Sequence, residues 1–184
     1  MKKILLCLLA AAWLASCNSE KDKTAGEADA KTGGETASSA TPADLPYTAL
    51  YSSDFTEDVS DADLKMVLMS YKDWETGNMT GLGNVMADSV QLDGNDGRSR
   101  KMTNADLMKE WSMYRDSLSS INIRMHAWQK MYAADKKEPH VVVWYTEIDT
   151  YKDGRVDSAD YHDINGIKDG KINWYSSYKR GYKK

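Results

Sequence analysis

The sequence predicts an α+β domain in which three helices cover one face of a curved antiparallel sheet. Two observations favour this class. Apolar side chains recur at the spacing of an α-helix up to about residue 118, and the period then changes to the two-residue alternation of β-strands. In that second part Asp153-Gly154 and Asp169-Gly170 indicate tight turns, which predict consecutive antiparallel strands.

Three helices are expected in the first two thirds of the domain. The first follows Ser60-Asp61-Ala62-Asp63, which has the form of a capping box, and ends at Gly77. A shorter helix covers residues 80–87. The third begins where Thr103-Asn104-Ala105-Asp106 repeats the capping signal. Each longer helix carries one apolar stripe, formed by Leu64, Val67, Leu68, Tyr71 and Trp74 in the first and by Leu107, Trp111, Tyr114 and Leu118 in the third.

The strands are placed by their alternation. A short strand at 89–93 with a return near 98–102 lies between the second and third helices. Residues 119–134 alternate apolar and polar side chains, as a half-buried strand does. The apolar run 141–145 opens the next strand and indicates that both of its faces are covered. The Asp-Gly turns then lead into strands near 156–165 and 171–180.

The N-terminus has the pattern of an exported chain. Residues 1–16 combine a basic start with an apolar run that is shorter than the roughly 20 residues of a membrane-spanning helix, so they indicate a signal peptide. Leu14-Ala15-Ser16-Cys17 resembles the lipobox of bacterial lipoproteins. That resemblance implies that Cys17 becomes the first residue, acylated with a chain such as palmitate, and anchors the protein in the cell envelope. We expect the outer membrane. Ordinary cleavage that leaves Cys17 as a free thiol is the alternative.

Composition separates a tether from a single domain. Residues 17–46 are rich in small and polar side chains and nearly devoid of large apolar ones, which predicts a flexible tether before a domain at 47–184. The net charge of −4 becomes −6 once Lys2 and Lys3 leave with the signal peptide, and the two signs are mixed, which disfavours a nucleic-acid partner. No disulfide is expected, because Cys7 also leaves. The three histidines lack ligand spacing, so neither a metal site nor any other cofactor is predicted.

The order of elements from Asp61 to Lys179 resembles the nuclear transport factor 2-like superfamily, in particular its SnoaL and ketosteroid-isomerase-like branch. The segments that carry the resemblance close the first helix, enter the first strand and precede the last strand, and they are Tyr71 to Asn78, Met86 to Val90 and Ile164 to Ile172. The resemblance implies a cone-like sheet with the helices on its concave face and an apolar pocket between them. It also implies that the outer face of the sheet can pair with a second subunit.

The same resemblance suggests where catalytic groups would lie. Isomerases of the family place a carboxylate base near the end of the first strand, where this chain has Asp93. The family's carboxylic acid donor falls near His162, which shares a strand face with Asp160 by the two-residue period. The tyrosine donor of the first helix falls near Ser70, beside Tyr71. Only one of the three positions keeps its residue type, which argues against steroid-type isomerisation. Turn chemistry alone also explains Asp93, and a strand surface alone explains Asp160 and His162.

Aromatic side chains are the more unusual feature of the chain, with 6 Trp and 11 Tyr against a single Phe. Most would serve an ordinary core, and a subset facing the cone is the candidate ligand site, namely Tyr71, Trp74, Trp111, Trp144 and Trp174. Trp128 and Tyr132, alternating with His126 and Lys130, would suit the outer face as a dimer interface or a half-exposed surface.

Three functions follow from these observations. The favoured one is a lipid-anchored binding module that holds a small, partly apolar ligand without transforming it. The first alternative is an enzyme of the isomerase, cyclase or dehydratase kind that uses Asp93 and His162, helped by Asp160 or Tyr71. It predicts that these side chains converge in one cavity. The second alternative is a dimerising interaction module that uses the outer sheet face.

Overall fold

A computed structural model describes residues 45–182 of the chain. Cys17, the predicted signal peptide and almost all of the predicted tether lie outside the described residues, so lipidation stays a prediction. Within residues 45–182 no helix is long and apolar enough to cross a bilayer.

The three predicted helices are present, with the predicted caps on the two longer ones. Helix α1 spans Asp61–Thr76, the Ser60 side chain accepts a hydrogen bond from the backbone N–H of Asp63, and Gly77 ends the helix at a φ of 76°. Helix α2 spans Met79–Val85 and ends two residues earlier than predicted. Helix α3 spans Asn104–Asp116, and its N-cap Thr103 accepts from the backbone N–H of Asp106.

The strands within residues 45–182 form one sheet in the order β1-β4-β5-β6-β7-β2-β3. Their bounds are β1 Phe55–Thr56, β2 Met86–Asp93, β3 Ser99–Thr103, β4 Leu118–Ala133, β5 Glu138–Tyr151, β6 Val156–Lys168 and β7 Lys171–Gly181. The predicted meander is confirmed, since β4, β5, β6 and β7 pair in sequence and antiparallel. One pair of strands differs from the expectation, since β2 runs parallel to β7. The two strands are separated in sequence by β3, α3 and most of the meander, so no tight turn joins them.

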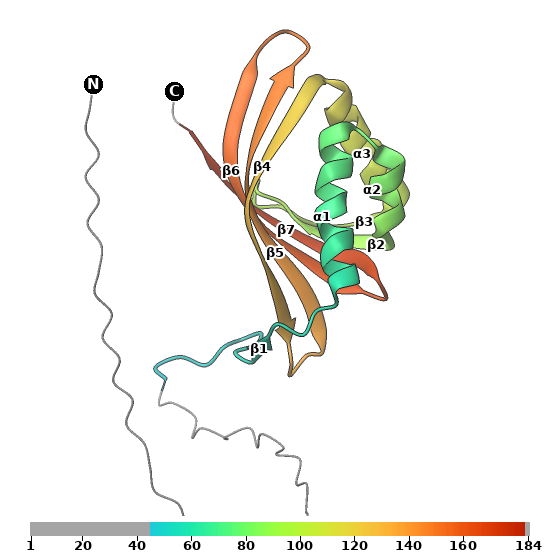
Figure 1. Cartoon of the computed structure of the whole chain (residues 1–184). Helices are drawn as coiled ribbons and strands as arrows, with labels where there is room; N and C mark the ends of the chain where they lie inside the picture. Colours follow the sequence, from blue (N-terminus) through green and yellow to red (C-terminus); the bar gives the residue numbers. More distant parts are fainter. Residues whose placement is uncertain (1–44, 183–184) are drawn as a thin grey trace, which may run out of the picture. The chain divides into compact units, whose positions relative to one another are not determined.

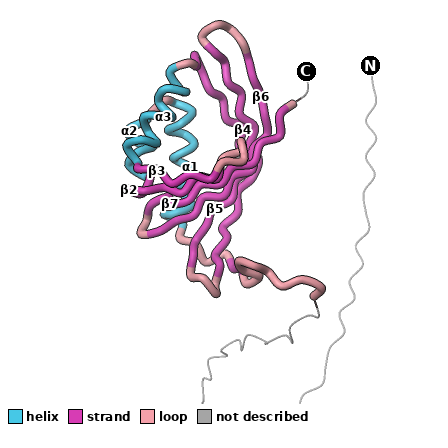
Figure 2. The backbone as a smooth tube through the Cα atoms, turned by 180° about the vertical axis from the view of Figure 1, so that it is seen from behind, coloured by secondary structure: helices cyan, strands magenta, loops and turns pink. Residues whose placement is uncertain are grey.

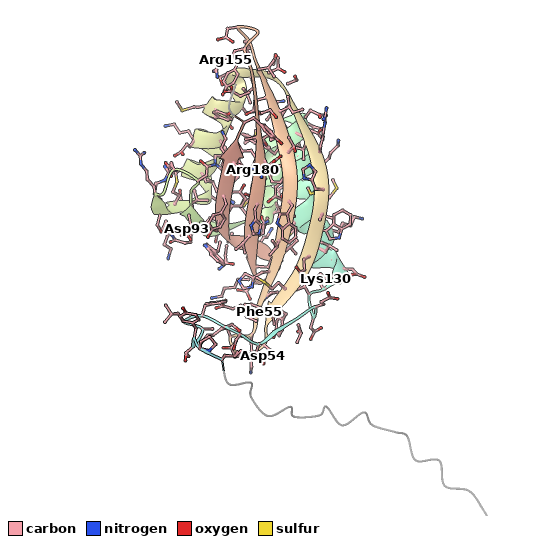
Figure 3. The ribbon with its side chains drawn as sticks, turned by 90° about the vertical axis from the view of Figure 1, so that its left-hand side faces the viewer. Asp54, Phe55, Asp93, Lys130, Arg155 and Arg180 are labelled. Carbon is pink, nitrogen blue, oxygen red and sulfur yellow. The ribbon has the colours of Figure 1, made fainter. Side chains whose placement is uncertain are left out.

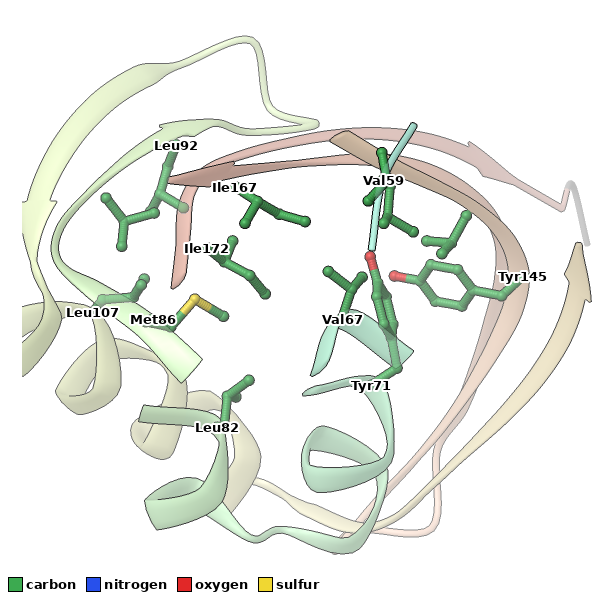
Figure 4. Close-up of a cluster of buried hydrophobic side chains, with 13 residues drawn as sticks. Val59, Val67, Tyr71, Leu82, Met86, Leu92, Leu107, Tyr145, Ile167 and Ile172 are labelled. Atoms are coloured by element: carbon green, nitrogen blue, oxygen red, sulfur yellow. The ribbon is translucent and has the colours of Figure 1, made fainter. Parts of the chain in front are cut away.

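The sheet is strongly curved, and the three helices lie together on one side of it (Figures 1 and 2). The predicted α+β class and helix placement are therefore confirmed. Between the helices and the sheet lies an apolar core (Figure 4), whose fully buried members include Val67, Val90, Leu107, Val141, Val143 and Ile172.

A bulge in β4 changes which side chains face the helices. The pairing of β4 with β5 shifts between Met125 and Ala127, so the regular alternation is interrupted at His126. Before the bulge Met125 lies opposite Tyr145, and after it Trp128 lies opposite Val143, both on the side of the core. The expectation that His126, Trp128 and Tyr132 share the outer face is therefore wrong. Tyr132 packs against the core, and Trp128 is half exposed at the β4 edge.

Candidate functional site

A cavity of about 440 Å³ lies between the helices and the concave face of the sheet. Seven aromatic side chains line it, and the lining also contains one strongly buried carboxyl group, that of Glu147. Pockets of this size that combine apolar walls with a few placed polar groups are the usual form of small-molecule sites. This cavity is therefore the candidate functional site.

The helices supply one aromatic wall of the pocket, made of Trp74, Trp111 and Tyr114. Trp74 belongs to the last turn of α1, and the other two lie three residues apart on one face of α3. The Trp74 ring stacks with that of Tyr114 at 6.1 Å between centroids and contacts that of Trp111 at 6.2 Å. These contacts hold the three rings as one surface across two helices.

The sheet supplies the opposite wall, made of Tyr145 from β5, Tyr161 from β6 and Tyr175 from β7. Each follows the two-residue alternation that turns every second side chain toward the helices. Tyr145 and Tyr161 are directly paired and stack at 5.2 Å between ring centroids. Tyr175 meets the helical wall, since its ring lies edge-on to Trp111 at 5.9 Å.

Glu147 lies two residues beyond Tyr145 on β5 and is only 8% exposed. Its Oε2 accepts a hydrogen bond of 3.0 Å from the Trp74 indole N–H. Burial, and next the charge of nearby Asp149, raise the pKa of the Glu147 carboxyl to about 8, although the Trp74 hydrogen bond acts in the opposite direction. At neutral pH this side chain is therefore mostly protonated, and it changes its charge in the physiological range.

Asp163 on β6 forms a hydrogen-bonded hub beneath the aromatic walls, and it is fully buried. Its Oδ2 accepts from the hydroxyls of Tyr71, Tyr145 and Tyr175 at 3.1, 2.8 and 2.6 Å. Figure 4 shows the hydroxyls of Tyr71 and Tyr145 directed toward one another. Burial raises the pKa of the Asp163 carboxyl, whereas the hydroxyl donors lower it. The hub fixes the rings that line the pocket, and Asn165 donates to the Tyr71 hydroxyl at 3.0 Å.

Two further charged residues, Asp149 and Lys179, lie near Glu147. Asp149 accepts a 2.7 Å hydrogen bond from Tyr114, and burial raises its pKa. Lys179 lines the pocket, with its ammonium nitrogen 5.5 Å from the centre of the Tyr161 ring.

The structure brings together three of the five aromatic residues that the sequence proposed as ligand-binding. Tyr71, Trp74 and Trp111 line the pocket. Trp144 and Trp174 do not, because strand alternation turns their neighbours Tyr145 and Tyr175 inward in their place. Trp144 instead stacks on His162 at 4.9 Å between ring centroids, and the Trp174 indole N–H donates to Asp93.

The proposed catalytic residues Asp93, Asp160 and His162 are absent from the pocket lining. Asp93 accepts a hydrogen bond from the outward-facing Trp174, and His162 stacks on the outward-facing Trp144. Asp160 accepts from Arg180 at 2.6 Å, and Figure 3 shows Arg180 on the outer face of the sheet. Convergence of Asp93 and His162 in one cavity is therefore not what the structure shows. The family resemblance placed the carboxylic acid donor near His162, whereas the carboxyl group that points inward belongs to the next residue, Asp163.

Glu147 and Asp163 are the principal site residues that sequence reasoning missed. Both lie on strands that the sequence located, but neither was singled out as a candidate. The available signal was an acidic residue within a strand that alternates with aromatic side chains, as in Tyr145-Thr146-Glu147 and Tyr161-His162-Asp163. Within residues 45–182 no group of three His, Cys, Asp or Glu side chains is arranged to hold a metal ion.

Fold and site together define a pocketed α+β domain with helices closing one side of a curved sheet. No family model and no curated protein matches the chain. Among solved structures, AusH from Aspergillus nidulans aligns with a TM-score of 0.54 at 13% identity, covering 68% of this chain and 88% of AusH. An LEH-like epoxide hydrolase from M. tuberculosis aligns with a TM-score of 0.54 at 10% identity, covering 65% of this chain and 83% of the hydrolase.

A nuclear transport factor 2-like protein of unknown function from Burkholderia pseudomallei aligns with a TM-score of 0.51 at 12% identity, covering 66% of this chain and 92% of that one. The chain thus has the nuclear transport factor 2-like fold, as its sequence predicted. At such identities the likeness establishes the fold and leaves the chemistry to be argued from the site.

Proposed function

We propose that this domain binds a small, partly apolar molecule between its two aromatic walls and does not transform it. The observation that carries the proposal is the cavity of about 440 Å³ whose opposing walls are rings held by stacking and by the Asp163 hub. A preformed site of this kind binds with little ordering cost. A ligand that buries roughly 200 Å² of apolar surface there gains on the order of 5 kcal/mol before association costs.

We further propose that the domain acts at a membrane surface, held by lipid on Cys17 through the tether. A bound molecule would then stay in the cell envelope. Pairing of two copies through the outer sheet face is a separate proposal, supported by Tyr178, which is 60% exposed beside His162 on that face. Light scattering on the purified protein tests it, and a monomer at all concentrations would count against it.

One observation favours an enzyme as the second candidate. The pKa of Glu147, about 8, suits a group that takes up and releases a proton near neutral pH inside a pocket. Such an enzyme would use Glu147, with the hydroxyls of the Asp163 hub as donors, in place of Asp93 and His162. Recovery of a chemically changed molecule after incubation would support this candidate over binding alone.

The binding proposal is tested by extracting the protein, purified from its native source, and identifying released small molecules by mass spectrometry. Trp111→Leu removes part of one pocket wall. Trp128→Leu is the matched control, since that indole is 52% exposed and does not line the cavity. We expect the same molecule from the wild type and the control, and much less of it from Trp111→Leu. Equal recovery from all three proteins, or none from any, would overturn the proposal.

A further inference from the structure

The charged groups of the pocket are paired at its rim and act on Glu147 deeper in. At the rim Arg100 is fully engaged by Glu110 through two hydrogen bonds of 3.0 and 2.9 Å, so this pair is neutral as a unit. Deeper in, the charge of Asp149 raises the pKa of Glu147 and that of Lys179 lowers it, while Lys179 and Arg115 both lower the pKa of Asp149. Once its proton is displaced, the Glu147 carboxylate adds a negative charge near that of Asp149, which a bound cation would balance.

Glu147 lines the cavity and has one acceptor oxygen that no described residue binds. Its Oε2 is occupied by Trp74, and among the described residues no hydrogen bond fills Oε1. The side chain is more than nine-tenths buried and lines the pocket, so a molecule in the cavity can reach this carboxyl group. A bound donor or cation would pair with this acceptor in a site where burial limits its hydration.

The walls suit a cation as well as an apolar body. Seven aromatic side chains line the space, and the faces of such rings attract positive charge. The protein already shows this attraction, because the Lys179 ammonium lies 5.5 Å from the centre of the Tyr161 ring at the pocket wall. Lys179 therefore marks where positive charge is tolerated, and it competes with any cation that enters.

On these grounds, and resting on the proposed binding function, we infer that the ligand is an organic cation. It carries an ammonium or amidinium group that pairs with the Glu147 carboxylate, and an apolar or aromatic body that lies between the two walls. Because free Glu147 is mostly protonated at neutral pH, the incoming cation must displace its proton to the buffer. Binding of a permanently charged cation should therefore release up to one proton and tighten as the pH rises.

The test uses three probes that share a phenyl ring and differ in charge: benzyltrimethylammonium, benzyl alcohol and phenylacetate. Titration calorimetry with the purified full chain, in two buffers of different ionisation enthalpy, measures affinity and proton release. We expect the cation to bind most tightly. Between pH 6 and 8 its affinity should rise by as much as tenfold per pH unit and then level off.

Two substitutions should act in opposite directions. Glu147→Gln should weaken cation binding at pH 8 by about tenfold or more and abolish its pH dependence, while benzyl alcohol binds as before. Lys179→Met should tighten cation binding, because it removes the competing ammonium. Glu57→Gln is the matched control, since Glu57 is exposed and does not line the cavity.

Equal or tighter binding of benzyl alcohol or phenylacetate overturns the cation inference and leaves the binding function standing. A cation affinity unchanged by Glu147→Gln overturns it as well. If none of the three probes binds and no molecule is extracted from the native protein, the proposed function itself fails.

Discussion

Replacing Glu147 with Gln should make the stability of the domain less sensitive to pH and raise it under alkaline conditions. The substitution keeps the size of the side chain. The amide oxygen can still accept the hydrogen bond that the Trp74 indole donates at 3.0 Å. What the substitution removes is the acid, and hence the need to ionise a group that is only 8% exposed.

The magnitude follows from the pKa of Glu147, which folding raises from 4.5 to about 8. Below pH 4.5 the carboxyl is protonated in both the folded and the unfolded chain, so it contributes no difference. Between pH 4.5 and 8 the unfolded chain releases the proton while the folded chain retains it, so the free energy of unfolding falls as the pH rises. At about 1.4 kcal/mol per pKa unit the wild type loses roughly 3 to 5 kcal/mol by pH 8.

Urea unfolding followed by tryptophan fluorescence, at pH 5 and pH 9, measures this difference. Wild type and Glu147→Gln should have similar free energies of unfolding at pH 5, and the variant should be the more stable by roughly 3 to 5 kcal/mol at pH 9. The variant Glu57→Gln, at an exposed position, should follow the wild type at both pH values. A constant difference between wild type and Glu147→Gln across this range would refute the reasoning.

Three further predictions concern other parts of the chain. Asp163→Ala leaves three buried tyrosine hydroxyls without their acceptor and should lower the free energy of unfolding by about 3–6 kcal/mol. Asp160→Ala is the control. It also removes an acceptor of three hydrogen bonds, but these lie near the solvent, so the free energy of unfolding should fall much less. Gly77→Ala forces an alanine to a φ of 76° and should cost about 1 kcal/mol in urea unfolding, and Gly181→Ala should be nearly neutral. Cys17→Ser should abolish labelling with radioactive palmitate and move the protein from the membrane to the soluble fraction, and retention of label would contradict the proposed anchor.

The helices could be predicted because their signals are local. Ser60 and Thr103 accept hydrogen bonds from the backbone three residues later, and Gly77 adopts the left-handed conformation that closes α1. Each of these interactions spans only a few residues, so the sequence contains all the parts. The Asp-Gly turns are local in the same sense, which is why the meander was also predicted.

The site was harder because both faces of the sheet carry aromatic side chains. Trp144 and Tyr145 are neighbours on β5, and Trp174 and Tyr175 are neighbours on β7, so the two-residue period separates each pair without saying which member faces the helices. That choice is fixed by contacts distant in sequence, such as the edge-on contact of Trp111 with Tyr175. Nothing within the strands themselves determines it.

Long-range geometry also explains the remaining differences. The bulge at His126 shifts the register of β4 by one residue, so His126 leaves the face that Trp128 and Tyr132 occupy. The parallel pairing of β2 with β7 joins residues more than 80 positions apart, such as Gln91 and Trp174. Pairing of this kind depends on how the whole sheet assembles, which the local pattern of a single sequence does not report.

The buried acids are where local rules and the fold conflict, and this conflict supports a functional interpretation. Glu147, Asp149 and Asp163 point into the interior of a small domain, and burial raises the pKa of all three, so each reduces stability as the pH rises. Asp163 and Asp149 are bound by tyrosine hydroxyls, and they position rings that line the pocket. Of the three, only Glu147 lines the pocket itself, and its hydrogen bond comes from Trp74. A group that costs stability and lines a pocket is best explained by what enters that pocket.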